Sequence, residues 1–435
     1  MTLDKLQSLF SRVGCTRLYA KSLAKNDNSK NQIYFGPDFT ALSLFPTKEV
    51  RPDSSPTNLI YKAALDFQWL ADGGGACPAP GAQLILYPQY PEVRFSGFLN
   101  GCAGAPNELL NQRLVGRVLF LGVTADRKIF GFVADGGSDL AHNFRSLELE
   151  PSLGVFVELA VTPGSQAPKD QELLLKELCR ISRLGWIDSK RLDSSGEVLT
   201  CNATNCGGYT LEAELGIRPN GKAEPDYCGY EVKQYSVPSL GRLDSGRITL
   251  LTPEPTGGLY VDQSPVAFIK RYGYADKAGR EDRLNVGGVH RAGKRHPLTG
   301  LTLTFLGYEG GKITDDKGCI ALVDDAGNVA ASWAFAGLMQ HWTRKHAHAA
   351  YVPSEARREP NLQYRYGGRV RMAGQPDFLK LLAAFAGGTV YYDPGIKLEA
   401  ASSTTPRLKR RSQFRISSAD LTAIYRKIEI VEACF

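Results

Sequence analysis

The sequence has no long hydrophobic run, no internal repeat and no low-complexity tract. None of its apolar stretches approaches the length of about 20 residues that a membrane-spanning helix needs, so we expect no membrane partner. The stretch MTLDKLQSLFSRVG mixes acidic and basic residues in an amphipathic helical pattern, which argues against a signal peptide. A content of 43% hydrophobic and 22% charged residues is typical of a soluble globular protein.

The nine cysteines lack both a pairing rhythm and the CxxC spacing of many metal and redox sites. We therefore expect small, reduced, buried thiols and a cytoplasmic location. Cys201, Cys206 and Cys228 lie near one another, but no pair of histidines accompanies them, so they predict buried thiols rather than a zinc site. His346 and His348 alternate on a predicted strand and are interpreted as core or surface histidines rather than ligands.

An excess of positive charge is absent from the first part of the chain. Residues 1–160 contain 15 Lys and Arg against 15 Asp and Glu, whereas the remainder contains 37 against 30. The whole formal net charge of +7 therefore belongs to the C-terminal part. A basic lobe suits a polyanionic partner such as nucleic acid, although many basic proteins bind none.

At 435 residues the chain is too long for a single core, which predicts two domains. VTPGSQAPKD has two prolines and no periodicity, so we place a linker at residues 161–169. Before it, the short apolar runs AQLILYP, RVLFLGV and IFGFVAD predict a mostly β domain over residues 1–160, entered by one short helix. Beyond it, helical and strand patterns alternate, which predicts an α/β domain over residues 170–435.

Helical periodicity is clearest just after the linker. The segment QELLLKELCRISRLGWI places Leu174, Leu178, Ile181 and Trp186 on roughly one helical face. Further on, TLEAELGI and WAFAGLMQHWTRK predict helices, while ITLLTPE, LTLTFLGYE, IALVDD and HAAYV predict strands.

The segment PDYCGYEVK, residues 225–233, places charged side chains on a predicted strand. Because alternate residues of a strand share a face, Glu231 and Lys233 project together and Val232 points into the core. Asp226 reaches the same place if the chain bends near Gly229. Two carboxylates and an amine are costly to bury together without a metal or a partner, so this segment predicts a functional site.

Other (Asp/Glu)-x-Lys triplets occur at Asp126–Lys128, Asp188–Lys190 and Asp315–Lys317. They lie in predicted turns, where a solvated loop explains them. On spacing alone, a salt-bridged surface strand would explain the triplet at 231–233 equally well.

A third carboxylate, Glu212, lies on the predicted helix TLEAELG, fourteen residues before Asp226. With it, LEAELGIRPNGKAEPDYCGYEVK resembles the core of the MutH/MvaI/BcnI branch of the PD-(D/E)XK nucleases. The interval Asp-x4-Glu-x-Lys is similar to the MvaI side of this branch, whereas MutH has a longer interval. The resemblance extends loosely over residues 170–435 and implies a restriction-endonuclease-like α/β fold there.

The resemblance also implies the chemistry. Asp226, Glu231 and the Val232 carbonyl would bind Mg²⁺, which prefers oxygen ligands, and Lys233 would orient the attacking water or stabilise phosphorane charge. Glu212 would hold a second metal or a metal-bound water. The implied protein is a sequence-specific type II restriction endonuclease that acts on double-stranded DNA as a monomeric catalytic unit, beside a separate DNA methyltransferase. The rival interpretation is a non-catalytic, or MutH-like nicking, DNA-binding protein built on the same core.

Two basic segments of the C-terminal part are candidates for DNA contact. GVHRAGKR is nearly a phosphate-binding loop, but an arginine stands where that loop needs Ser or Thr, so we interpret it as a basic loop. In RLKRRSQFRIS, residues 407–417, a strand would point alternate side chains one way toward bases or phosphates, although a charged edge strand is the plainer alternative. The candidate residues are Arg291, Lys294, Arg295, Lys409, Arg410, Arg411, Gln413 and Arg415.

The N-terminal domain offers a polar segment, RLYAKSLAKNDNSKNQIYFGPDF, rich in side chains that pair with base edges. Its sequence is loosely similar to the start of the EcoRII-type effector domain, which implies a DNA-binding B3-like β-barrel. A polar surface loop is the alternative. The candidate DNA-binding residues in this domain are Lys21, Asn26, Asn28, Lys30, Asn31, Gln32 and Arg94.

Overall fold

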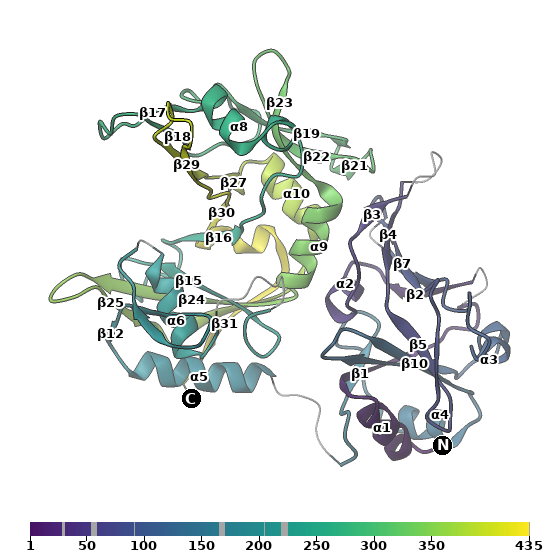
Figure 1. The fold of residues 1–435 in the computed structure, drawn as a ribbon. Helices are drawn as coiled ribbons and strands as arrows, with labels where there is room; N and C mark the ends of the chain where they lie inside the picture. The colour runs from purple at the N-terminus through teal and green to yellow at the C-terminus, as the bar shows by residue number, and fades with distance from the viewer. Residues whose placement is uncertain are drawn as a thin grey trace. The chain divides into compact units, whose positions relative to one another are not determined.

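The computed structural model describes residues 1–27, 31–53, 59–90, 92–164, 170–203, 205–218 and 225–434. The chain divides into two compact units, Met1–Lys169 and Asp170–Phe435 (Figure 1). Of the predicted linker, residues 165–169 lie outside the described residues. In the part of the chain that the structure describes, no helix is both long and apolar enough to span a membrane.

The N-terminal unit is built mainly from two β-sheets. The first sheet has the strand order β11 (Val157–Leu159), β1 (Cys15–Ser22), β9 (Val118–Thr124), β10 (Ile129–Ala134), β5 (Phe67–Leu70) and β6 (Ala76–Pro78). The second has the order β2 (Gln32–Gly36), β8 (Glu92–Ser96), β7 (Gln83–Tyr87), β4 (Tyr61–Ala64) and β3 (Arg51–Pro52). The helices are α1 (Leu3–Arg12), α2 (Ala41–Leu44), α3 (Asn107–Asn111) and α4 (Asp139–Arg145).

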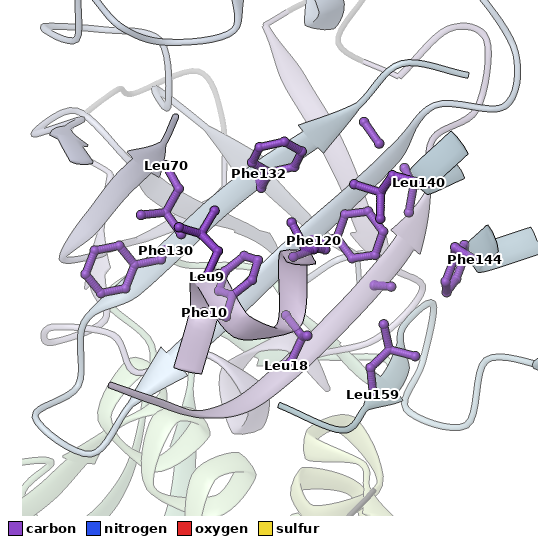
Figure 2. Packing of buried hydrophobic residues seen from close by; sticks show 14 of the residues in the cluster. Leu9, Phe10, Leu18, Leu70, Phe120, Phe130, Phe132, Leu140, Phe144 and Leu159 are labelled. Atoms are coloured by element: carbon purple, nitrogen blue, oxygen red, sulfur yellow. The ribbon is translucent and has the colours of Figure 1, made fainter. Parts of the chain in front are cut away.

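One hydrophobic core lies between the first sheet and helices α1 and α4 (Figure 2). Helix α1 begins after Thr2, whose hydroxyl accepts a hydrogen bond from the Lys5 amide, and it buries Leu6, Leu9 and Phe10 at helical spacing. Figure 2 shows Leu9 and Phe10 among side chains of the sheet. The predicted amphipathic helix at the N-terminus is therefore confirmed.

A second core of aromatic rings joins the two sheets. The ring of Phe67 on β5 packs edge-on against that of Phe95 on β8, with 5.0 Å between the centroids. The predicted apolar strands are confirmed as β7, β9 and β10, and β9 pairs with β10 as an antiparallel hairpin. The expected barrel is not found, because the described strands of this unit form two open sheets that pack face to face.

The C-terminal unit has a mixed α/β fold with several sheets. Its central sheet has the order β12 (Ile187–Asp188), β25 (Gln363–Tyr366), β24 (His348–Arg357), β26 (Arg369–Pro376) and β31 (Tyr425–Glu432), and β15 (Glu231–Ser236) pairs in parallel with β24. The helical elements are α5 (Asp170–Arg183), α6 (Cys206–Glu214), α7 (Leu259–Asp262), α8 (Pro265–Tyr272), α9 (Phe335–Lys345), α10 (Phe378–Ala386) and the 3-10 helix η1 (Ser418–Ala423).

Smaller sheets complete this unit. Two three-stranded sheets have the orders β16 (Arg247–Leu251), β30 (Phe414–Ser417), β27 (Tyr391–Tyr392) and β19 (Thr302–Leu306), β22 (Cys319–Val323), β23 (Val329–Ala334). A four-stranded sheet has the order β17 (Tyr274–Ala275), β18 (Arg283–Gly287), β28 (Gly395–Glu399), β29 (Arg407–Lys409). Two strand pairs are β13 (Lys190–Leu192) with β14 (Val198–Thr200), and β20 (Tyr308–Glu309) with β21 (Lys312–Ile313).

The core of the central sheet determines which face of β15 is polar. Val232 packs with side chains of α5 and α6 on one face of the sheet, together with Ala350 and Val352 of β24. By the alternation of a strand, its neighbours Glu231 and Lys233 project from the opposite face, as predicted. Figure 1 shows α5 and α6 beside the strands that they cover.

Two predicted helix boundaries are wrong. Helix α5 ends at Arg183, and Gly185 adopts a left-handed φ of 68°, so Trp186 lies beyond the helix instead of on its face. Trp333 lies in strand β23, one residue before its end, rather than in α9, which begins at Phe335. Trp333 is buried, and half-buried Trp186 lies under the guanidinium groups of Arg357 and Arg365, so tertiary contacts that helical periodicity does not reveal place both rings.

The prediction that all cysteines are reduced thiols is wrong for six of the nine. The structure pairs Cys77 with Cys102, Cys179 with Cys434, and Cys201 with Cys206 as disulfides. Their Cα atoms lie 6.0, 4.9 and 5.8 Å apart, within the range for a disulfide. Because one pair is separated by 255 residues in sequence, spacing could not reveal it.

The packing of β9 against α1 generates a stability prediction. A Cβ atom at Gly122 would lie 2.4 Å from the Phe10 ring and 2.6 Å from the Cys15 sulfur, so Gly122→Ala should overpack this core and cost about 1–3 kcal/mol of unfolding free energy. The measurement is urea denaturation of the full chain. Gly73→Ala is the matched control, because a Cβ there would meet nothing within 4 Å. Equal midpoints for the two variants would contradict the predicted packing.

Candidate active site

The polar residues singled out in the sequence converge around the start of β15. Glu212 lies near the end of α6, Asp226 lies in the segment before β15, and Glu231 and Lys233 lie on β15 itself. A tight turn between Tyr227 and Tyr230 connects Asp226 to the strand. Gly229, in this turn, has a left-handed φ of 74°, so the chain bends where the sequence predicted a bend.

A hydrogen bond connects Asp226 to the strand. Asp226 Oδ2 accepts from the backbone amide of Val232 at 3.1 Å. The turn thus folds the aspartate back onto β15, beside the backbone of the residue between Glu231 and Lys233.

Glu231 is a buried carboxylate that binds two ammonium groups. Its side chain is 1% exposed, and Oε1 accepts from Lys233 Nζ at 2.6 Å and from Lys345 Nζ at 2.9 Å. Among the described residues, its other oxygen, Oε2, has no hydrogen-bond partner. A buried carboxylate oxygen without a partner is costly, so this atom is available to a ligand.

The three carboxylates have different pKa values. Burial alone would raise the pKa of Glu231, but the charges of Lys233 and Lys345 outweigh it and hold the value at about 2. Burial, and then repulsion by Glu231, raises the pKa of Asp226 to about 6. Burial, and then repulsion by Asp226, raises the pKa of Glu212 to about 7. Glu231 is therefore the one of the three that stays ionised at low pH.

The residues present fit a hard cation held by oxygen atoms. Outside the gaps in the described chain, no cluster of three or more His, Cys, Asp or Glu side chains is arranged to hold a metal. The predicted ligand set needs only two such side chains, Asp226 and Glu231, with the Val232 carbonyl and water, which suits Mg²⁺. The unpartnered Glu231 Oε2 and the raised pKa of Asp226 both indicate negative charge that a cation would stabilise.

Sequence reasoning missed Lys345. This residue is the last of α9, 114 positions after Glu231, and it shares Glu231 Oε1 with Lys233. Its segment, HWTRK, has an ordinary basic helix terminus, so nothing in the sequence distinguishes it.

The next residue, His346, is a buried and hydrogen-bonded core histidine, in agreement with its interpretation from sequence, although it caps α9 rather than lying on a strand. Its Nε2 donates to the Leu250 carbonyl, because a carbonyl only accepts, and its Nδ1 accepts from the Tyr425 hydroxyl at 2.7 Å. Tyr425 in turn accepts from Tyr351. Burial holds the pKa of His346 well below its ordinary value. The neutral histidine therefore attaches the end of α9, and with it Lys345, to β16 and β31.

The cations of the basic loop 288–295 lie in different environments. Arg291 donates to the Gly388 carbonyl and stacks over the Tyr391 ring at 4.7 Å. Arg295 is exposed and forms a two-pronged ion pair with Asp325. Lys294 is exposed. His290 of this loop is buried, and its Nε2 lies 3.0 Å from the Thr299 hydroxyl.

The expected single basic strand over residues 407–417 is not found. The segment forms two strands, β29 and β30, that belong to different sheets. Gln413 precedes β30 and is buried near the Thr249 hydroxyl, so it does not alternate with Arg411 and Arg415 along one strand. Residues 410–413, which belong to neither strand, break the alternation that the sequence pattern assumed.

The remaining cations of this segment lie at the surface. Lys409, Arg410 and Arg415 form ion pairs with Glu399, Glu254 and Asp393, respectively, and Arg411 is exposed.

Residues of the predicted N-terminal DNA-binding segment are placed in different environments. Lys21 is buried, and its ammonium is bound 2.8 Å from Asp27, so it does not face solvent. Gln32 Oε1 accepts from Arg94 at 3.1 Å, and the Arg94 guanidinium lies over the Tyr87 ring.

Asn26 and Asn31 are exposed. Asn28 and Lys30 lie outside the described residues.

Comparison with known proteins gives one clear match. The model of the MvaI/BcnI restriction endonuclease family matches residues 175–425, more than half of the chain. Two similar solved structures are restriction endonuclease MvaI with its cognate DNA (16% identity, TM-score 0.46) and MvaI in the absence of DNA (15%, 0.34). Each alignment covers 61% of this chain and 99% of that one. A search of curated proteins found no match.

The raised pKa of Asp226 generates a stability prediction. Its carboxyl binds protons more tightly in the folded chain, with a pKa of about 6 against 3.8, so folding loses stability as the pH rises through this window and the loss persists above it. Asp226→Asn cannot ionise and should stabilise the metal-free protein at pH 8 by about 1–2 kcal/mol, with a smaller gain at pH 5.

The measurement is thermal denaturation in EDTA at both pH values. Asp193→Asn is the control with the opposite sign, because hydrogen bonds from Ser195 and the Glu197 amide lower the pKa of Asp193. A Tm at pH 8 that Asp226→Asn leaves unchanged would contradict the repulsion among the carboxylates.

Proposed function

The chain belongs to the MvaI/BcnI restriction endonuclease family, and from this premise we propose that it is a Mg²⁺-dependent type II enzyme that cuts double-stranded DNA at a specific sequence. The observation that supports this most is the buried Glu231 carboxylate, which binds two ammonium groups at one oxygen and leaves the other without a partner. The site further supports a PD-(D/E)XK assignment, with Asp226, Glu231 and Lys233 in its three positions.

Asp226 and Glu231, with the Val232 carbonyl, are the residues that would hold the metal. When bound, Mg²⁺ would neutralise charge on the scissile phosphate and lower the pKa of a water molecule. The contact between Asp226 and the Val232 amide holds the first carboxylate against the strand that carries the second. The ligands are therefore positioned by backbone before any metal arrives.

We assign to Lys233 the stabilisation of the transition state. Burial would lower its pKa, but the charge of Glu231 outweighs burial and raises it, so the ammonium stays protonated at neutral pH. A fixed positive charge beside the metal ligands can donate hydrogen bonds to the developing negative charge on the phosphate. Lys345, on the same carboxylate oxygen, keeps Glu231 ionised and oriented. Glu212, with a pKa of about 7, is suited to accept a hydrogen bond from, or take a proton from, a nearby water.

For the N-terminal unit we propose a DNA-binding role similar to that of an EcoRII-type effector domain. The support is limited to the polar segment at residues 17–39 and the surface of Gln32 and Arg94, whose side chains are of the kind that reads base edges. We further propose a monomeric catalytic unit, a separately encoded methyltransferase and a cytoplasmic location.

The central prediction is that Asp226→Ala abolishes cleavage but spares DNA binding, because it removes a metal ligand and not a phosphate contact. Wild type and variant are incubated with plasmid DNA in Mg²⁺ or EDTA, and binding is measured in Ca²⁺. Cleavage by the variant at the wild-type rate would remove this site from the mechanism. If the wild type itself cuts nothing in Mg²⁺, the non-catalytic interpretation holds, and a single-strand product would indicate nicking.

The second prediction concerns the shape of the cation at position 233. Lys233→Arg keeps the charge but replaces a compact ammonium by a wide planar fork, so we expect single-turnover cleavage to slow by about a hundredfold or more. Lys317→Arg is the matched control, since it has the same spacing after an acidic residue but lies exposed in a turn. Equal rates for the two variants would reduce Lys233 to a surface charge.

A further inference from the structure

The sheet of strands β16, β30 and β27 has one apolar face and one polar face. Ile248 and Ile416 are opposite each other in the register, and both are fully buried. The strand alternation places the next residues on the other side. In the register, Arg247 is opposite Ser417, and Arg415 is opposite both Thr249 and Tyr391. This second face is polar, although it spans three strands that are far apart in sequence.

Strand β16 of this sheet is connected to the candidate active site through His346 and Lys345. Leu250 of β16 accepts a hydrogen bond from His346, which follows Lys345 in the chain. Lys345 in turn binds the Glu231 carboxylate. A DNA duplex bound at Glu231 would therefore lie near this sheet.

A cavity of about 230 Å³ lies at the end of the polar face where β16 starts, and we call it the sheet-end pocket. Its lining includes Ser245 and Arg247, Ser417 at the end of β30, Asp420 in η1, and Tyr391 with Arg291 stacked on its ring. The cavity is large enough for the edge of a nucleobase, and its lining carries donors, acceptors and an aromatic ring.

The charges in the sheet-end pocket are not neutralised. Arg247 and Asp420 are both exposed, and neither forms an ion pair or side-chain hydrogen bond within the described residues. Other cations on or near this face are already bound, Arg415 by Asp393 and Arg291 by the Gly388 carbonyl. The pocket therefore holds one free guanidinium and one free carboxylate apart from each other.

The combination favours a base pair over a phosphate. The pocket contains two arginines and several hydroxyl groups, as a phosphate site would, but the Asp420 carboxylate would repel a phosphate. A guanidinium instead pairs with O6 and N7 of guanine, while a carboxylate accepts from the N4 amino group of cytosine. We propose that Arg247 and Asp420 read one G·C base pair of the recognition sequence from the major groove. This inference deepens the proposed function, because it takes double-stranded DNA as the ligand.

The test is a binding selection that does not depend on cleavage. Full-length protein with Asp226→Ala is the parent, and it selects duplexes from a random-sequence library in EDTA. Arg247→Ala and Asp420→Ala, each added to the parent, should lose preference at the same G·C position by about ten- to a hundredfold, because a good bidentate contact discriminates by this factor. Arg247→Lys keeps the charge but not the fork, so it should retain affinity for non-cognate DNA and lose the same preference.

The control is Arg183→Ala, an exposed arginine at the end of α5, which should leave the consensus unchanged. Loss of affinity by Arg247→Ala that is uniform over all sequences, with a shallower salt dependence and no effect of Asp420→Ala, would indicate a phosphate contact and overturn the inference. Unchanged selection by both variants, or a parent that enriches no sequence, would overturn it as well. Because selection is read without cutting, failure of the plasmid cleavage test is a separate result.

Discussion

The ion pairs of Glu231 are the interaction on which the rest of the candidate site depends. A buried carboxylate is expensive unless it is matched by nearby positive charge, and here two lysines from different elements supply it. Lys233 comes from the same strand and Lys345 from the end of a helix more than a hundred residues later. The pairing thus requires that β15 and α9 be packed correctly before the charges can be buried, so folding and site assembly are coupled.

The same arrangement separates the three carboxylates by their affinity for protons. Glu231 is held ionised by its lysines. Burial, and then the charge of Glu231, raises the pKa of Asp226, and burial, and then Asp226, raises that of Glu212. A gradient of this kind is typical of sites that bind cations or transfer protons, because neighbouring acidic groups are not then all charged at once. The unsatisfied oxygen of Glu231 lies at the strongly ionised end of the gradient.

Local patterns predicted the local parts of this structure well. Strand alternation placed Glu231 and Lys233 on one face, and Gly229 marked the bend that returns Asp226 to them. The N-terminal helix and the β9–β10 hairpin were predicted equally well, because the sequence pattern of each lies within one continuous segment. The failures include Lys345 at the carboxylate, the cysteine pair 179–434 and the division of residues 407–417 between two sheets, and also the nearby pair Cys201–Cys206 and the helix boundaries at Trp186 and Trp333. These depend on tertiary packing that a single sequence does not display.

The pair formed by Cys179 and Cys434 has a consequence for chain connectivity. One cysteine lies in the first helix of the C-terminal unit, and the other lies next to the end of the chain, with Cα atoms 4.9 Å apart. The two ends of this unit therefore meet, and every residue of the candidate active site lies between them. Such a unit can in principle be circularly permuted: a short peptide joins the old ends, and new ends are opened in an exposed turn such as residues 325–327, far from Glu231 in sequence. The permuted chain would contribute the site residues in a different sequence order, whereas the geometry of the site would depend only on which strands and helices pack together.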